Sequence, residues 1–251
     1  MQHYFLVFIF SFFVITPGWS NVPDSFTQNN IKYQTFFGDC PSKSSELMTL
    51  TVMKEFEKNH SLKDVKERIL REKLDEKYFL SEYRISFNPA IKTVRVNLKC
   101  PEPLAKVQVY KTNGDEHYSA ILGENAKLYE PQYENLMKAE KKIRFNLPLL
   151  AITTDQLEGA APTILAELMK KMGSEIRSKV SEIILSKNND LTVIFALGPK
   201  ATSVFMGSEF WDEKLTKLEK IVSYVSKNKR YPATINLVNS KKVVVKFSDK
   251  I

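Results

Sequence analysis

The chain has 251 residues, 43% hydrophobic and 26% charged, so it can build one large domain or two small ones and shows no sign of wholesale disorder. Its formal net charge is +8, but the lysines are spread along expected helix faces and hairpins and form no single block with aromatic residues. Nucleic acid is therefore not expected as a partner, while a weak attraction to anionic lipid headgroups stays open.

The first twenty residues differ from the rest of the chain. Residues 4–15 are almost wholly apolar and carry no charge, a run too short for a membrane span but close to the core of a signal peptide. Gly18 and Ser20 are the small residues that a signal peptidase needs, so cleavage is expected after Ser20. The alternative is that residues 1–20 are the end of a longer membrane anchor, because no Lys or Arg precedes the apolar run.

Residues 21–30 are polar and turn-rich, which is typical of a linker, and a first domain is expected over 31–103. A strand at 31–37 is followed by two amphipathic helices. Ser44 and Ser45 offer N-caps to the first helix, whose expected apolar stripe is Leu47, Leu50, Met53 and Phe56. The second helix begins at a capping box of Ser61 and Asp64, and its stripe is Leu62, Val65, Ile69 and Leu74.

Two alternating strands at 79–87 and 93–98, joined at Asn88-Pro89, complete the first domain. The order strand, helix, helix, strand, strand predicts two helices that cover one face of a three-stranded sheet.

The second domain is expected over 104–251. It begins with strands at 106–110 and 118–122, separated by a turn at Asn113-Gly114. A long helix is expected from Pro162 to Ser186, with a stripe of Leu165, Leu168, Met172, Ile176, Val180, Ile183 and Ile184. The remaining expected elements are strands at 191–196 and 204–206, a helix capped by Asp212, and a final hairpin of 234–238 and 242–247. The predicted fold class is α+β, with a mixed or antiparallel β domain.

The sequence contains few residues or motifs typical of a catalytic or metal site. Its histidines are His3, His60 and His117, and none has a neighbourhood that would make a triad or a set of metal ligands. There is no GxSxG, no P-loop and no Rossmann glycine motif. We therefore expect a non-catalytic protein with no cofactor, no metal and no small-molecule substrate.

Cys40 and Cys100 can pair in an oxidising compartment, but the sequence leaves a bridge and two buried thiols equally open.

Short motifs occur at residues 83–105, 147–149, 181–183, 204–207 with 214–215, and 235–237. In this order they resemble motifs of the bacterial division protein family FtsQ (DivIB). Residues 83–105 resemble the hairpin of the family's first domain, including its exit motif at Glu102-Pro103-Leu104-Ala105. Leu147-Pro148-Leu149 resembles the family's Leu-Pro-x-Leu motif. The other matching stretches are Ser181-Glu182-Ile183, 204–207 with Lys214-Leu215, and Ile235-Asn236-Leu237. The family's cytoplasmic tail and full membrane span have no counterpart in this sequence.

This resemblance implies a POTRA domain of strand-helix-helix-strand-strand order, followed by the family's β domain. It also implies a non-catalytic scaffold of the division complex on the periplasmic side of the cell envelope, secreted or anchored to the inner membrane. Its partners would be FtsB-like and FtsL-like division proteins, bound through the end of the β domain. The alternatives are a POTRA-type docking protein in outer-membrane protein assembly or transport, and an exported hydrolase of unrecognised type.

The last expected strand is the candidate binding site. If it forms the edge of a sheet, a partner segment can add to it as a further strand. Val243, Val245 and Phe247 are expected to face the core, with Val244 and Lys246 on the other side. Lysines on an edge strand also deter aggregation, so the residues alone leave both interpretations open, and the resemblance favours binding. The expected partner-binding residues are Lys242, Val243, Val244, Val245, Lys246 and Phe247, with Tyr224 and Tyr231 beside the added strand and Lys241 as a further site for acidic residues.

Overall fold

The chain is an α+β protein with two mixed sheets. The structure, a computed structural model, describes residues 31–111, 117–131, 136, 147–186, 188–239 and 241–247. The apolar N-terminal segment, the linker at 21–30 and the turn expected at Asn113-Gly114 lie outside the described residues. The predicted fold class is therefore confirmed at the level of an α+β protein.

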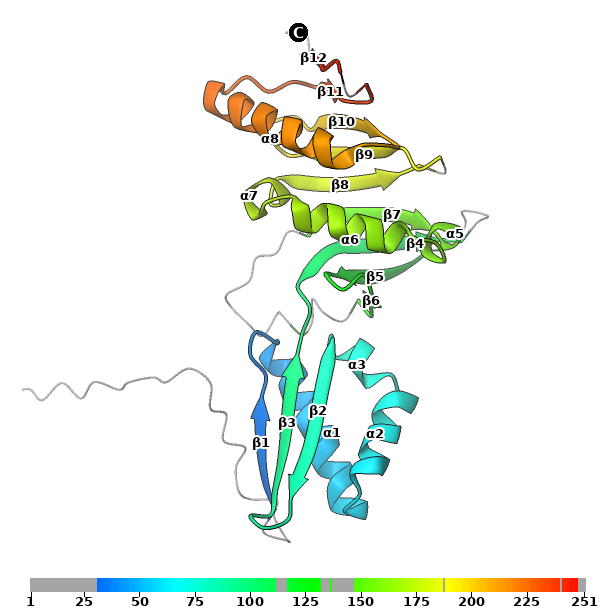
Figure 1. Cartoon of the computed structure of the whole chain (residues 1–251), viewed down its shortest axis with the longest axis vertical. Helices are drawn as coiled ribbons and strands as arrows, with labels where there is room; N and C mark the ends of the chain where they lie inside the picture. The colour runs from blue at the N-terminus through cyan, green and yellow to red at the C-terminus, as the bar shows by residue number, and fades with distance from the viewer. Residues whose placement is uncertain are drawn as a thin grey trace, which may run out of the picture.

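The first sheet has three strands, and its element order agrees with the sequence prediction apart from one added short helix. Its strands lie in the order β1-β3-β2, with β1 parallel and β2 antiparallel to β3. The helices α1 to α3 lie between β1 and β2 in the sequence and on one side of the sheet in space (Figure 1). The bounds are β1 Lys32–Phe36, α1 Ser42–Asn59, α2 Leu62–Arg71, α3 Leu74–Lys77, β2 Glu82–Asn88 and β3 Thr93–Lys99.

The start of α2 is as predicted, whereas the start of α1 is not and its buried face agrees only in part. The Asp64 N–H donates to the Ser61 Oγ at 3.3 Å, which caps α2. Pro41 takes the N-cap position of α1, so Ser44 and Ser45 lie buried inside the helix instead of capping it. Met53 and Phe56 of the expected stripe are buried, but Leu50 is exposed, and Met48, Thr49 and Val52 complete the buried face.

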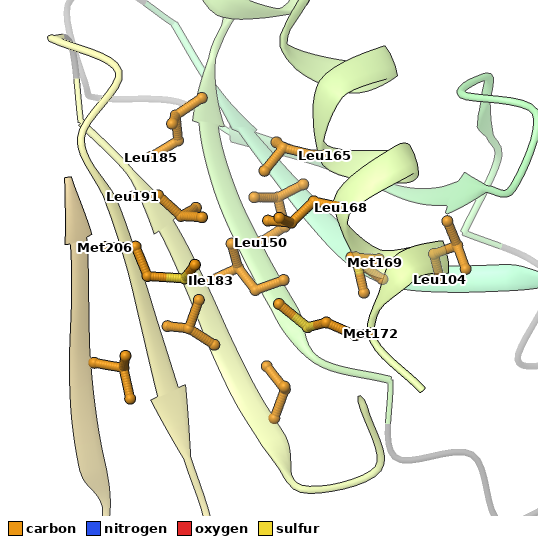
Figure 2. Packing of buried hydrophobic residues seen from close by; sticks show 14 of the residues in the cluster. Leu104, Leu150, Leu165, Leu168, Met169, Met172, Ile183, Leu185, Leu191 and Met206 are labelled. Atoms are coloured by element: carbon orange, nitrogen blue, oxygen red, sulfur yellow. The ribbon is translucent and has the colours of Figure 1, made fainter. Parts of the chain in front are cut away.

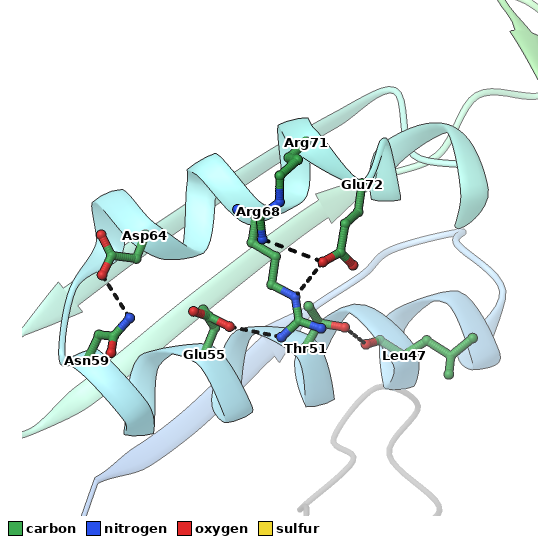
Figure 3. A network of polar contacts seen from close by, with 8 residues as sticks. All are labelled: Leu47, Thr51, Glu55, Asn59, Asp64, Arg68, Arg71 and Glu72. Atoms are coloured by element: carbon green, nitrogen blue, oxygen red, sulfur yellow. Dashed lines mark hydrogen bonds and ion pairs between the residues drawn. The ribbon is translucent and has the colours of Figure 1, made fainter.

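A polar cluster joins the two long helices of this part. The guanidinium of Arg68 on α2 donates to Glu55 of α1 at 2.9 Å and to Glu72 at 3.1 Å (Figure 3). Both Arg68 and Glu55 are largely shielded from solvent, and the hydrogen bond to Glu55 raises the pKa of Arg68. This arrangement fixes α2 against α1 on the face that does not touch the sheet core.

Cys40 and Cys100 form a disulfide, which decides between the two alternatives that the sequence left open. Their Cα atoms lie 5.1 Å apart, within the usual range for such a bridge. Cys40 precedes α1 and Cys100 follows β3, so the bridge links the start of the helical layer to the end of the sheet.

The second sheet has nine strands in the order β12-β11-β10-β9-β8-β7-β4-β5-β6. Most neighbours are antiparallel, but β4 with β7, β7 with β8, and β10 with β11 are parallel. The bounds are β4 Pro103–Tyr110, β5 His117–Gly123, β6 Leu128–Tyr129, β7 Leu149–Thr153, β8 Val180–Leu185, β9 Leu191–Phe195, β10 Thr202–Gly207, β11 Thr234–Asn236 and β12 Val244–Lys246.

Two helices cover one face of this sheet and bury its core. The helices α6 (Ala161–Lys171) and α8 (Trp211–Asn228) pack side by side over the strands, with the short helices α5 (Thr154–Leu157) and α7 (Ser174–Arg177) at the ends of α6 (Figure 1). Figure 2 shows Leu165, Leu168 and Met169 of α6 pointing at Leu150 and Ile183 of the sheet. Burial of this apolar surface is the main stabilising contribution.

The single long helix expected from Pro162 to Ser186 is wrong. The helix α6 ends at Lys171, because Met172 takes an extended ψ of 114° and Gly173 follows it with a ψ of 149°. Residues 180–185 form β8, with Val180, Ile183 and Leu185 buried between β7 and β9. The expected helix cap at Asp212 is also wrong, since Phe210 holds the N-cap position of α8 and Asp212 lies in its first turn.

A small apolar cluster connects the two sheets. The ring of Phe79, which follows α3, lies 4.7 Å from the ring of Tyr129 on β6, measured between centroids. Ile121 and Leu136 are buried in the same cluster, and Cys100 packs against it. The disulfide therefore lies beside the contact between the two parts of the chain.

Candidate protein-binding edge

The strand β12 lies at the end of the nine-stranded sheet. Within the described part of the chain, it pairs only with β11, in an antiparallel register that sets Ile235 opposite Val245. A turn at Asn239 joins the two strands: its side-chain oxygen accepts from the Lys241 N–H at 2.9 Å, and its carbonyl accepts from the Lys242 N–H at 3.2 Å. In Figure 1 this hairpin forms one extremity of the molecule.

Hydrogen bonds on the inner side of β11 establish which backbone groups of β12 point outward. The Ser203 N–H donates to the Ala233 carbonyl at 3.0 Å, and the Leu237 N–H donates to the Phe205 carbonyl at 2.8 Å. Odd-numbered residues of β11 therefore direct their backbone groups at β10, and the even-numbered Thr234 and Asn236 direct theirs at β12.

The partners of those even-numbered residues are Lys246 and Val244, so these two face β11. The Lys246 carbonyl does point at β11, where it accepts from the Ala233 N–H at 2.9 Å; Ala233 precedes β11 and directs its N–H and its C=O to opposite neighbours. Because backbone groups alternate along a strand, the N–H and C=O of Val245 point away from β11, toward the open edge. Val245 is thus the central backbone donor and acceptor for an added strand.

The side chains of β12 differ from the sequence prediction. Val243, Val245 and Phe247 were expected to face the core, but Val245 is 38% exposed and Phe247 is 37% exposed, hardly less than Val244 at 48%. The cause is that the buried core ends one strand earlier, at Ile235 of β11 and Leu237 just after it. The result is an edge strand with apolar side chains accessible on both faces.

One cation anchors the end of the strand. The guanidinium carbon of Arg230 lies 4.7 Å from the centroid of the Phe247 ring. Arg230 was not among the residues expected at the site. The signal that could have identified it is charge: residues 220–248 contain no Asp or Glu and seven basic residues, namely Lys220, Lys227, Lys229, Arg230, Lys241, Lys242 and Lys246.

The two tyrosines expected beside the added strand have different surroundings. Tyr224 on α8 is 71% exposed, so it is accessible to a partner. Tyr231 instead packs on the chain itself: a Cβ atom at Gly198 would lie only 2.6 Å from its ring. The close approach of this ring requires glycine at position 198, which gives Tyr231 a structural role.

The described residues provide neither a metal centre nor a membrane-spanning helix. No group of three or more His, Cys, Asp or Glu side chains is placed there to hold a metal ion. His60 stacks near Phe56 and His117 near Tyr110, at centroid distances of 5.9 Å and 5.4 Å. Within the same residues, no helix combines the length and apolar character needed to cross a bilayer.

No family model matches the chain, and no curated protein matches it significantly.

Proposed function

We propose that the chain is a non-catalytic binding protein that captures an extended segment of a partner protein by strand addition to β12. The observation that supports this proposal most strongly is the outward direction of the Val245 N–H and C=O, on an edge with no strand partner among the described residues. An added strand hydrogen-bonds to such an edge at every second residue, and pockets between alternate side chains give specificity.

The chemistry of the edge defines the partner segment. The exposed Val243, Val244, Val245 and Phe247 favour apolar residues on both faces of the added strand. The lysines at positions 241, 242 and 246 favour acidic residues near its ends. We expect a segment that is predominantly apolar in the middle and acidic at its flanks.

The cellular setting follows from the resemblance to the FtsQ (DivIB) family. The element order of the first sheet supports a POTRA-like domain, and the position of β12 supports binding at the end of a β domain. We propose a scaffold of the division complex in the cell envelope that binds FtsB-like and FtsL-like proteins. The bridge between Cys40 and Cys100 supports an oxidising, extracytoplasmic compartment.

A proline at position 245 tests the mechanism. Val245→Pro removes the outward N–H while leaving the donors that face β11, so the hairpin persists and strand addition fails. Val245→Ala is the matched control, because it truncates the side chain and keeps the N–H. The probe is the exported segment of an FtsB-like protein, titrated against each full-length variant. Loss of binding in the proline variant alone supports the proposal; equal binding by the proline and alanine variants contradicts it.

A second edge strand, β1 of the first sheet, supports the second candidate function. Among the described strands, β1 pairs only with β3, and Phe36 on β1 is half exposed. This edge suits a docking protein for outer-membrane assembly, which would take an unfolded chain beside β1. This candidate is favoured if a barrel protein co-purifies with the chain, if changes in β1 abolish the co-purification, and if Val245→Pro does not.

A further inference from the structure

A hollow of about 910 Å³ lies on the helical face of the second sheet. Its apolar lining comes from α6 and from the start of α8, and includes Ile164, Leu168, Phe210 and Trp211. Phe210 is 62% exposed, at a left-handed backbone position with φ of 55°. A large exposed aromatic side chain in the lining of a hollow offers apolar surface to a binding partner.

The rim of the hollow is acidic in a chain that is basic as a whole. Asp155, Glu167, Asp212 and Glu213 line it, and Lys171, the one basic residue among the described lining residues, is bonded to Asp212 at 2.7 Å. This bond joins α6 to α8 and raises the pKa of Lys171. With four carboxylates and one lysine, the described lining has a formal net charge of −3.

The hairpin that ends in β12 has the opposite character. It protrudes from the extremity of the molecule, exposes three valines and Phe247, and carries Lys241, Lys242 and Lys246 without a carboxylate in residues 220–248 (Figure 1). The hollow and the hairpin are therefore complementary in charge, and each exposes apolar surface that the other can cover.

Within one molecule the hairpin is held in the sheet by the pairing of β12 with β11, so it cannot enter the hollow. β8, which ends at the hollow with Leu185, is separated from β12 by three intervening strands of the same sheet, a distance of roughly 19 Å at normal strand spacing. We propose that the hollow between α6 and α8 receives the C-terminal hairpin of a second copy of this chain. The contact is head-to-tail, so each added copy leaves another hollow and another hairpin free.

Self-association of this kind uses the same hairpin that the proposed function assigns to partner capture. A copy seated in a neighbour's hollow has β12 occupied, so partner binding and self-association compete. This competition alone rests on the proposed function; the contact itself is tested without any partner.

The first test titrates a fluorescent peptide of residues 239–247 into the full chain and follows its anisotropy. Glu167→Lys with Glu213→Lys should weaken binding about tenfold, since each exposed ion pair contributes modestly and reversal makes it repulsive. Glu46→Lys, at an exposed position on α1, is the control for added positive charge. A peptide with its three lysines changed to glutamate should bind the reversed protein and not the original.

Restored binding in this charge swap supports the contact. Equal binding of the native peptide to the original and reversed proteins contradicts it, as does failure of the swap when both proteins retain native circular dichroism. The second test places benzoylphenylalanine at position 210 of the full chain. Irradiation should give a crosslinked dimer whose tryptic fragments join position 210 to residues 241–247. Monomer alone, or crosslinks to other parts of a second copy, would overturn the proposal.

Discussion

Arg230 lies over the ring of Phe247, with its guanidinium carbon 4.7 Å from the ring centroid. Arg230 follows the C-terminal end of α8, and Phe247 directly follows β12. The contact therefore connects the strand that forms the open edge to the helix that covers the neighbouring core. Because β12 buries little apolar surface of its own, this contact is one of the few that hold its end in place.

Replacing Arg230 by glutamine should loosen the edge without unfolding the chain. A cation–π contact at an exposed site contributes about 0.5–1 kcal/mol, so hydrogen exchange of the β12 amides should accelerate several-fold. Lys229→Gln is the matched control, since it removes a neighbouring positive charge. Equal acceleration in both variants would show that charge alone, and not the ring contact, orders the edge.

Reduction of the disulfide should lower the stability of the first sheet and its helices. The bridge closes a loop across a sequence separation of 60 residues. Loop-closure entropy assigns about 4 kcal/mol to a bridge of that span. Denaturant unfolding with and without reductant measures the effect. The double variant Cys40→Ser, Cys100→Ser should match the reduced chain and should not respond to reductant; a response in that variant would contradict the assignment.

The buried Lys214 should make stability depend on pH. Its Nζ donates to the Met206 carbonyl at 2.6 Å, and burial lowers its pKa below the ordinary value of 10.5. Between the folded pKa and 10.5 the unfolded chain binds more protons than the folded one, so the free energy of unfolding rises with pH in that window.

Lys214→Met should remove this contribution, so the stability of the native chain relative to the variant should increase as pH approaches 10.5. Urea unfolding at a series of pH values measures the difference between the two proteins. Lys220→Met, at an exposed position of the same helix, should show no such trend. A difference that stays flat or falls with pH would rule out a lowered pKa for Lys214.

Truncation of Phe79 should uncouple the two parts of the chain. The residue is fully buried against Tyr129 between the two sheets, and Phe→Ala changes at buried sites cost about 3–5 kcal/mol. Phe79→Leu, which fills much of the same volume, should cost less. We expect the alanine variant to unfold in two separate transitions, monitored by circular dichroism; a single cooperative transition at lower denaturant would argue against a joint that couples the two parts.

Short-range signals predicted the first sheet well. The Ser61 cap, the alternation in β2 and β3, and the strand order along the chain all depend on neighbouring residues, which the sequence displays directly. The expected stripe of α1 was right at Met53 and Phe56 but wrong at Leu50, because packing against the sheet selects Met48 and Val52 instead.

Long-range pairing explains the larger errors. Residues 176–184 contain apolar residues at helical spacing, which predicted a helix. Ile183 is instead buried in a strand, because β8 pairs with β7 on one side and β9 on the other. Neighbouring residues in the sequence do not reveal this pairing. The same limit applies at the site: the alternation of residues 243–247 predicted one buried face, whereas the core ends at β11. That the last strand forms a sheet edge was a correct expectation; which backbone groups it exposes required the register.

The central claim is that Val245 presents its backbone to an added strand. Hydrogen exchange measured residue by residue in the full chain, with and without the exported segment of an FtsB-like protein, tests it most directly. The Val244 and Lys246 amides face β11 and should already be protected in the free chain, while the Val245 amide should exchange rapidly until the segment binds and then become protected. Protection of Val245 in the free chain, or bound partner with Val245 still exchanging freely, would contradict the account.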